Sequence, residues 1–326
     1  MIDGAYSDWV AVESSVPQGT VTGPLMFILF INDLPDNISS NVRLFADDCI
    51  LYRTISGKTD ASILQNDLHT LTQWQNNWQM KFKAKKCYIL RATHARSPHT
   101  FTYNLNGIPL QDTSNHTYLG VNLTQDLSWN SHINNTTAKA NRSLGFIRRN
   151  LCSCATNIKD MAYKTLVRPI LEYCSTVWDP HSQNLINKLE AVQNRAARFV
   201  SGIYGRNSSI TSIKGNLGWD DLAMRRKVAR LTIFHQAIGG YLAIPARTFL
   251  RPVQRTTRSS SQNTNNFINI TTNKNCFKYS FIPRTLQDWN QLPKELTAIA
   301  DKKLFKSAIQ RLLKIKETEE TTTNTN

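Results

Sequence analysis

The feature that most constrains this chain is a pair of adjacent aspartates, Asp47 and Asp48, set between two short apolar runs. Val42 to Phe45 precedes the pair and is separated from it by Ala46 alone. Cys49 to Tyr52 follows the pair directly. Apolar runs of this composition on both sides of so short a polar step predict a β-hairpin. The sequence therefore predicts that the two carboxylates lie at the tip of a hairpin.

Two helices are expected on either side of this hairpin. Residues 23 to 34, GPLMFILFINDL, are apolar on nearly all sides and follow Gly-Pro, which predicts a buried helix that begins near Pro24. A strand of similar length fits the same pattern. From 60 to 80, apolar residues recur every three or four positions and predict an amphipathic helix with its stripe on the core: Leu64, Leu68, Leu71, Trp74 and Trp78.

The rest of the chain changes from strands to helices. Strands are expected at 87 to 90, 100 to 105 and 116 to 123, and Asn106-Gly107 predicts a tight hairpin turn. Beyond Trp129 the spacing predicts helices, followed by a polar low-complexity linker and then a foldable segment. The helices are expected near 130 to 151, 158 to 178, 184 to 204 and 219 to 238, the linker at 256 to 275 and the foldable segment at 277 to 315. The fold class is therefore α+β.

The net charge of +16 favours a polyanionic partner, with nucleic acid considered first. No acid occurs between Asp221 and Asp288. Two acid-free clusters stand out, although a solvated basic face without a partner is the alternative for each. The first contains Lys81, Lys83, Lys85, Lys86, Arg91 and Arg96, and the second Arg225, Arg226, Lys227, Arg230, Arg247, Arg251, Arg255 and Arg258.

No membrane partner is expected, because no apolar run reaches the roughly 20 residues that span a bilayer. The N-terminus also lacks a basic-then-apolar signal, so we expect the protein to work in the cytosol or nucleus and not to be secreted. Six cysteines in 326 residues do not form a disulfide framework. Zinc ligation is disfavoured because the spacing matches no ordinary structural zinc site; the residues concerned are Cys152, Cys154, Cys174 and His181.

An adjacent aspartate pair alone has an ordinary explanation, since Asp is common in tight turns. Its placement after Ser15-Val16-Pro17-Gln18-Gly19 and an apolar helix favours metal binding instead. Carboxylates held about 4 Å apart repel by about 4 kcal/mol at an effective dielectric near 20. A divalent cation removes that penalty, and Mg²⁺ accepts few protein oxygens when substrate phosphates complete its shell.

Several segments together resemble the reverse transcriptases of non-LTR retrotransposons, of the jockey-like and CR1-like kind. SVPQGTVTGPLMFILFINDLP followed by LFADDCILY resembles the motif B and motif C pair of that family. Further similarity follows in family order and covers nearly the whole chain: residues 78–87 resemble the next helix and lysine motif, 116–121 the YLGV primer-grip region, 162–178 and 189–199 the downstream helical part, and 281–293 the C-terminal segment.

This resemblance implies an RNA-directed DNA polymerase with RNA template, DNA primer, deoxynucleoside triphosphates and two Mg²⁺ ions. Asp47 would be a ligand of both metal ions, and Asp48 would support the metal site. The template and nucleotide would meet Pro17, Gln18, Gly19 and Lys86, and the primer would meet Tyr118, Leu119 and Gly120. Lys86 in a basic run is equally well explained as a surface lysine.

The resemblance also implies an order of domains and an omission. Residues 1–125 would be a partial right-hand palm and 126–255 a helical thumb-like or connection region; a polar linker (256–276), a C-terminal segment (277–316) and a disordered tail (317–326) follow. Residues 1–16 resemble the strand before motif B, so fingers and the aspartate of motif A are missing. We therefore expect a truncated protein that does not polymerise alone.

The alternative is a nucleic-acid-binding module retained without catalysis, and upstream coding sequence would separate the two. Ser15, Thr22 and Lys83 stand where the family usually has Gly, Leu and Asn. A palm that has lost strands and covering helices exposes apolar faces, so we expect marginal stability and association through residues 25–33.

Overall fold

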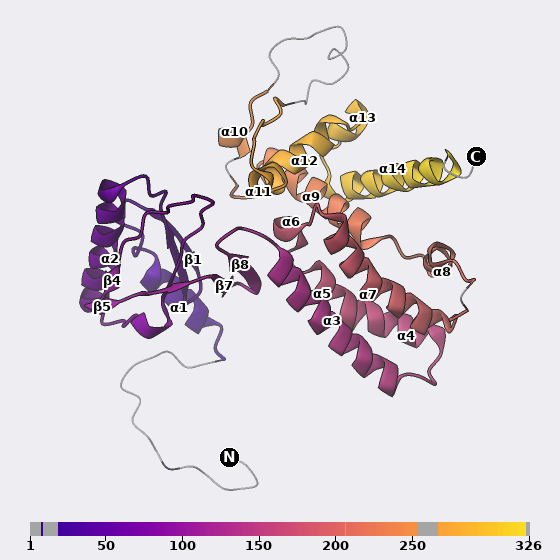
Figure 1. The fold of residues 1–326 in the computed structure, drawn as a ribbon, viewed down its shortest axis with the longest axis horizontal. Coiled ribbons are helices and arrows are strands. Elements are labelled where there is room, and N and C mark those ends of the chain that lie inside the picture. The colour runs from indigo at the N-terminus through magenta and orange to yellow at the C-terminus, as the bar shows by residue number, and fades with distance from the viewer. Residues whose placement is uncertain (1–7, 9–18, 206, 245, 253–266, 324–326) are drawn as a thin grey trace. The chain divides into compact units, whose positions relative to one another are not determined.

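The computed structural model describes residues 8, 19–205, 207–244, 246–252 and 267–323 (Figure 1). Within these ranges the fold is α+β, which confirms the predicted class, and its strands form four two-stranded sheets. Two compact units divide the chain: residues 1–114 form unit 1 and residues 115–326 form unit 2.

Unit 1 packs short strands around one long helix, α2, which covers Lys58–Trp78. Leu68, Leu71 and Trp74 on α2 are buried, as the apolar spacing predicted. The helix ends at Gln79, whose φ of +57° gives a left-handed C-cap. The other elements of unit 1 are α1 (Thr22–Ile31), β1 (Asn41–Phe45), β2 (Asp48–Tyr52), η1 (Ala84–Lys86), β3 (Tyr88–Leu90), β4 (Asn104–Leu105), β5 (Ile108–Pro109) and β6 (Gln111–Thr113).

The predicted hairpins of unit 1 are both present. β1 and β2 pair antiparallel from Asn41–Tyr52 to Phe45–Asp48, which leaves a two-residue loop. β4 and β5 are joined by Asn106 and Gly107 at φ of +53° and +73°, the conformation that Asn-Gly favours. β3 and β6 pair in parallel.

The predicted helix after Gly-Pro exists as α1, but its predicted burial is wrong. Leu25, Met26, Ile28 and Leu29 are 51–65% exposed, and only Gly23 and Ile31 of α1 are buried. The apolar residues surround the whole helix, whereas the described part of unit 1 packs against one side of it only. No helix of the described ranges is both long and apolar enough to cross a membrane.

Unit 2 begins with a hairpin where one strand was expected at 116 to 123. β7 (Asn115–Tyr118) and β8 (Val121–Thr124) pair antiparallel with Tyr118 opposite Val121. Leu119 and Gly120 form the turn at φ of +46° and +77°. Glycine adopts such a conformation readily. The turn therefore divides residues 116 to 123, which had been predicted as one strand from their β propensity, into two strands.

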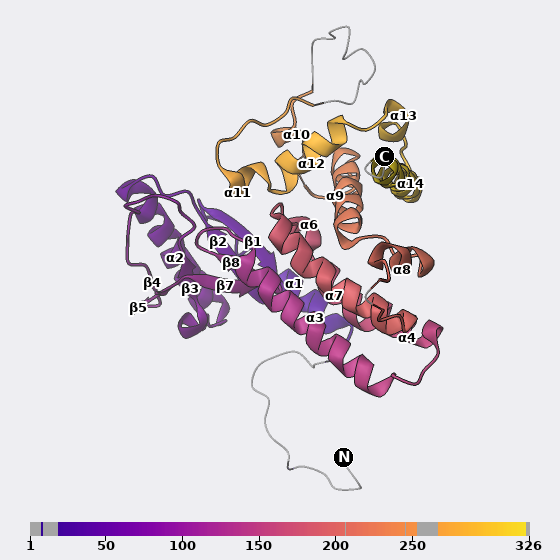
Figure 2. The same ribbon diagram turned by 45° about the vertical axis from the view of Figure 1, so that its right-hand side comes forward.

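A helical layer follows the hairpin, with α3 (Asn130–Asn150) and α7 (Gln183–Ser201) side by side in Figures 1 and 2. The helix expected at 158 to 178 is broken into four pieces, because Pro169 lacks a backbone N–H and Cys174 adopts a φ of +54°. These are α4 (Thr156–Ala162), the π-helix η2 (Tyr163–Val167), α5 (Arg168–Glu172) and α6 (Ser175–Trp178); the unpredicted α8 covers Ile210–Asn216.

The C-terminal part of unit 2 packs on α9 (Leu222–Ile238) around Trp289 and Phe305. Phe267 lies in the expected linker, yet its backbone exchanges two hydrogen bonds with the Asn290 side chain. The remaining helices are α10 (Ala246–Phe249), α11 (Asn275–Lys278), α12 (Phe281–Asn290), α13 (Lys294–Thr297) and α14 (Lys302–Thr323). The backbone of α14 continues as helix through residues 317–323, where disorder was expected; glutamate is a good helix former.

We predict that replacing two exposed residues of α1, Leu25→Gln with Leu29→Gln, lowers self-association and leaves the free energy of unfolding nearly unchanged. Both side chains are more than half exposed, so they contribute to contacts between molecules rather than to the core. Light scattering measures the association. Ile31→Ala is the control, because Ile31 is 7% exposed and its truncation should cost about 2–5 kcal/mol in chemical unfolding. Unchanged association of the double variant would contradict this prediction.

Candidate nucleic-acid and metal site

The Asp47-Asp48 pair lies at the tip of the β1–β2 hairpin, as the sequence predicted. Ala46 and Asp47 form the loop, and Asp48 begins β2 opposite Phe45. Ala46 adopts a φ of +49°, a left-handed conformation that is strained for a residue with a side chain. Both aspartates are exposed. The hairpin therefore presents two adjacent carboxylates to solvent on a small, sharply turned loop.

Buried polar residues of α2 and its surroundings fix the base of this hairpin. The Asp67 carboxylate, 3% exposed, accepts hydrogen bonds from the backbone N–H groups of Ser39 and Ser40, both at 2.9 Å. The Trp74 indole donates to Asp33 Oδ1 at 2.8 Å. Ser40 directly precedes β1, so Asp67 sets where the strand begins. Sequence reasoning missed Asp67, although a single aspartate on the apolar side of an amphipathic helix was a usable signal.

Only two of the four predicted nucleotide-binding residues, Gly19 and Lys86, lie within the described residues. Pro17 and Gln18, like Ser15, lie outside the described residues. Gly19 is exposed at a φ of +82°, and a Cβ there would have no neighbour within 4 Å. Its conformation, not crowding, is what favours glycine at this position.

Lys86 belongs to an exposed lysine run that a buried glutamine holds in place. Gln75 Oε1 accepts hydrogen bonds from the backbone N–H of Phe82 and from the Asn106 side chain, both at 2.8 Å. Phe82 therefore anchors the segment between α2 and β3. We call the four exposed lysines around it the lysine run: Lys81, Lys83, Lys85 and Lys86. Arg91 of the same predicted cluster instead pairs with Asp112 at 2.8 Å.

The predicted primer-binding residues form the end of the β7–β8 hairpin in unit 2. Tyr118 and Leu119 are half-buried and Gly120 is exposed. The Asn122 side chain donates to Ser131 Oγ at 2.8 Å, which ties β8 to the start of α3. Asn122 also donates its backbone N–H to His132 Nδ1 at 3.2 Å, and burial lowers the pKa of that imidazole.

Tyr173 supports the same turn, and the sequence analysis did not predict this contact. Its hydroxyl donates to the Leu119 carbonyl at 3.0 Å. Its own carbonyl accepts from the indole of the buried Trp178 at 2.8 Å. No local pattern could have paired residues that lie 54 positions apart.

The second predicted basic cluster is not a free basic surface, because its central arginines are buried and form ion pairs. Arg226 and Arg230 of α9 are 1% and 2% exposed. Arg225 forms an ion pair with Glu172, and Lys227 pairs with Asp288 at 3.0 Å. Of the others, Arg251 is exposed, whereas Arg255 and Arg258 lie outside the described residues and the Arg247 side chain is not described.

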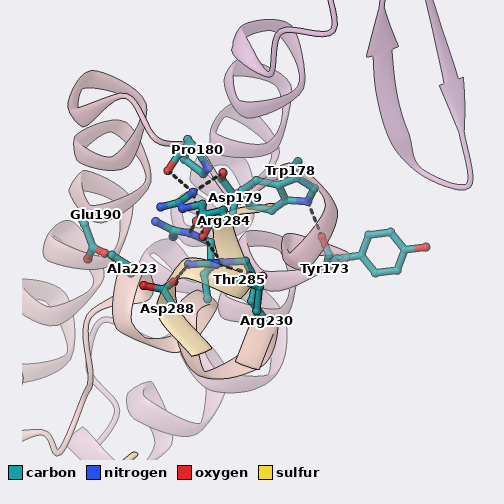
Figure 3. Close-up of polar contacts among 11 residues, drawn as sticks. Tyr173, Trp178, Asp179, Pro180, Glu190, Ala223, Arg230, Arg284, Thr285 and Asp288 are labelled. Atoms are coloured by element: carbon teal, nitrogen blue, oxygen red, sulfur yellow. Dashed lines mark hydrogen bonds and ion pairs between the residues drawn. The ribbon is translucent and has the colours of Figure 1, made fainter. Parts of the chain in front are cut away.

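Asp179 is the centre of this ion-pair network (Figure 3). Its two carboxylate oxygens accept from Arg226 Nε at 2.7 Å and Arg230 Nε at 2.8 Å. Arg284 of α12 lies 3.2 Å from the same carboxylate and also donates to the Asp179 carbonyl at 2.8 Å. Arg230 extends the network to Asp288 at 2.9 Å. One carboxylate thus joins the end of α6 to α9 and α12.

The network places more positive than negative charge in the interior. Burial lowers the pKa of the Arg284 guanidinium, while Asp179 opposes that effect. Glu190, whose carboxylate accepts from the Ala223 backbone N–H at 2.9 Å, has a pKa raised by burial. Removing one partner of a buried ion pair leaves an uncompensated charge, so the network depends on Asp179.

The metal-binding capacity of the described residues is limited to the aspartate pair. Nowhere in the described ranges do three or more His, Cys, Asp or Glu side chains gather in a group that could hold a metal ion. Two adjacent carboxylates supply hard oxygen ligands of the type that Mg²⁺ prefers, but they are an incomplete set for two ions. The residues thus fit one part of a two-metal site.

Comparison with known proteins shows which sequences this chain is similar to. Residues 2–123 match the family model described as reverse transcriptase (RNA-dependent DNA polymerase). The resemblance to the reverse transcriptases of non-LTR retrotransposons is confirmed. The chain is 29% identical over 217 residues to the RNA-directed DNA polymerase from mobile element jockey of Drosophila melanogaster. The aligned region covers 62% of this chain and 23% of that relative.

Two further relatives of this reverse transcriptase family give the same result. The jockey polymerase of Drosophila funebris is 30% identical over 217 residues, covering 61% of this chain and 23% of the relative. The probable RNA-directed DNA polymerase from transposon BS of Drosophila melanogaster is 29% identical over 216 residues, covering 61% and 24%. The chain thus spans about a quarter of the length of these relatives. No solved structure matches it.

We predict that Asp179→Asn lowers the free energy of unfolding of unit 2 by about 3–5 kcal/mol, the cost of breaking a buried ion pair. The substitution keeps the size of the side chain and removes the charge that three arginines share. Chemical denaturation measures the loss. Lys314→Gln is the control within unit 2, because the Lys314 side chain is 56% exposed in its pair with Asp220 and should contribute no more than about 1 kcal/mol. Equal effects of the two substitutions would contradict the prediction.

Proposed function

We propose that this chain is a catalytic part of an RNA-directed DNA polymerase of a non-LTR retrotransposon, and that it needs a further carboxylate to polymerise. The observation that carries the proposal is the exposed Asp47-Asp48 pair at the tip of the β1–β2 hairpin, within the residues matched by the reverse transcriptase family model. The names of the relatives support the same activity.

Mg²⁺ is the proposed cofactor, with Asp47 and Asp48 as its ligands in this chain. When bound, two such ions activate a primer 3′-hydroxyl and stabilise the leaving pyrophosphate. The exposed position of both aspartates leaves room for substrate oxygens to complete the coordination. The missing ligands would come from an aspartate equivalent to that of motif A, which none of the described residues supplies.

The remaining predicted residues are proposed to hold the substrates. Pro17, Gln18 and Gly19 would lie against the nascent base pair. At Gly19 the exposed backbone without a side chain supports a close approach. Lys86, at the end of the lysine run, would neutralise phosphate, and a plain surface lysine stays the alternative.

The primer strand is proposed to meet Tyr118, Leu119 and Gly120 at the β7–β8 turn. The exposure of Gly120 supports contact with a sugar-phosphate backbone. RNA template, DNA primer and deoxynucleoside triphosphates are the proposed partners and substrates, with action in the cytosol or nucleus. A partial palm up to about residue 125 and a thumb-like or connection region at 126–255 remain the proposed functional division.

The decisive experiment is primer extension by a fusion that adds the upstream part of the related jockey polymerase, including its motif A. We predict Mg²⁺-dependent extension of a DNA primer on an RNA template by the fusion, and none by the chain alone. Asp47→Asn should reduce extension by the fusion more than about 100-fold. Even the loss of a group that only orients a metal ligand lowers metal affinity or activity by about 10–100-fold, and Asp47 is proposed to be a ligand itself.

Asp36→Asn is the matched control for this experiment, since Asp36 is another exposed aspartate of unit 1. It should leave extension unchanged. Templated extension by the unmodified chain, abolished by Asp47→Asn, would show that its site is complete. If a folded fusion fails, reverting Ser15, Thr22 and Lys83 to Gly, Leu and Asn tests whether these departures from the family pattern are responsible.

A second candidate function is nucleic-acid binding without catalysis. The exposed lysine run favours it, because lysine contacts with phosphate need no metal site. The basic runs of the sequence belong to no module known to read base edges, so we expect binding to have little sequence preference. A fusion that binds primer–template but does not extend it, even after the three reversions, would favour this second function.

A further inference from the structure

The turn of the β7–β8 hairpin is held in a conformation that one of its residues disfavours. Leu119 adopts a φ of +46° and Gly120 a φ of +77°. A residue with a side chain loses roughly 1–2 kcal/mol in the left-handed region, so a leucine stays there only when its surroundings compensate. The turn therefore needs support from outside the hairpin.

Tyr173 supplies that support through both of its polar ends. The phenol hydroxyl donates to the Leu119 carbonyl at 3.0 Å, within the turn itself. The Tyr173 carbonyl accepts from Trp178 Nε1 at 2.8 Å, and Trp178 is fully buried. Figure 3 shows this bond and the Tyr173 ring extending away from Asp179. The turn is thus connected to the core of unit 2 through one side chain.

The ring of Tyr173 also lies against the second residue of the turn. A Cβ placed on Gly120 would come within 3.2 Å of the ring atom Cε1. This contact is tighter than ordinary packing, so an alanine at 120 would have to displace the ring or the turn. Gly120 is consequently favoured by its φ and by the ring.

Tyr173 is 58% exposed although its hydroxyl and its backbone carbonyl are both hydrogen-bonded. The Tyr173 ring lies against Gly120, and both residues are exposed. Such a surface suits a sugar-phosphate backbone, which needs close approach over glycine and packs its sugar on an aromatic ring.

We infer that Tyr173 is a positioning residue that holds the Leu119-Gly120 turn in the form that receives the primer strand. The inference rests on the proposed function of the hairpin. Tyr173 acts through the turn and takes no part in bond making. The ordinary alternative is a hydrogen bond that stabilises the hairpin without any ligand.

Two measurements on the full chain separate these roles. The first is hydrogen–deuterium exchange of peptides that cover residues 115–124, and the second is the affinity for a labelled DNA primer annealed to a longer RNA template. Tyr173→Phe removes only the hydroxyl, and we expect exchange in the turn to rise about fivefold, as for the loss of a hydrogen bond of ordinary strength. The affinity for primer–template should fall about 3- to 10-fold in a chain that remains folded.

Tyr204→Phe is the matched control, because Tyr204 is 59% exposed in the same unit, and it should change neither measurement. Gly120→Ala should weaken primer–template binding at least as much as Tyr173→Phe. Unchanged exchange in Tyr173→Phe would overturn the inference outright. Raised exchange with unchanged affinity would overturn the positioning role and leave only local stabilisation. Failure of the wild-type chain itself to bind primer–template would instead overturn the proposed function.

Discussion

The buried carboxylate of Asp179 is the interaction on which the organisation of unit 2 depends. It neutralises arginines from α9 and α12 at the end of α6, and these segments lie far apart in the sequence. A charge buried without a partner would cost several kcal/mol, so the three segments must meet in one arrangement for the network to be satisfied.

The same network adjoins the support of the Leu119-Gly120 turn, which we propose meets the primer strand. Trp178 directly precedes Asp179 and donates its indole N–H to Tyr173, which in turn donates to Leu119. A buried polar residue has a comparable role in unit 1, where Asp67 holds the backbone just before β1. In each unit, hydrogen bonds to side chains distant in sequence hold the turn or strand start next to the residues that we propose to be functional.

How much of this could be predicted from the sequence depends on the range of the interactions. Hairpins and the amphipathic α2 follow from local patterns, so Asp47, Asp48 and the Asn106-Gly107 turn were placed correctly. The exposure of α1 was not predicted, because the apolar composition of a helix does not show whether other elements pack against all of its sides. The turn at Leu119-Gly120 was missed because leucine seldom adopts a positive φ.

Long-range ion pairs were the other limit of prediction. Arg226 and Arg230 were assigned to a basic surface because no acid lies near them in sequence, yet their partner is Asp179, 47 and 51 positions away. The lysine run, in contrast, is exposed as its local pattern predicted. The described residues of the two predicted basic clusters therefore include a buried set that holds unit 2 together and an exposed lysine run that we propose contacts nucleic acid.

The dependence of nucleic-acid affinity on salt tests this division most directly. Removing one lysine that neutralises a phosphate should reduce the slope of log affinity against log salt by about 0.7–0.9. Replacing Lys81, Lys83, Lys85 and Lys86 by Gln should therefore lower the slope for a primer–template by up to about 3. Arg251→Gln, at an exposed arginine outside the run, measures the effect of one ordinary surface charge. A slope that the four lysine substitutions leave unchanged would contradict the account.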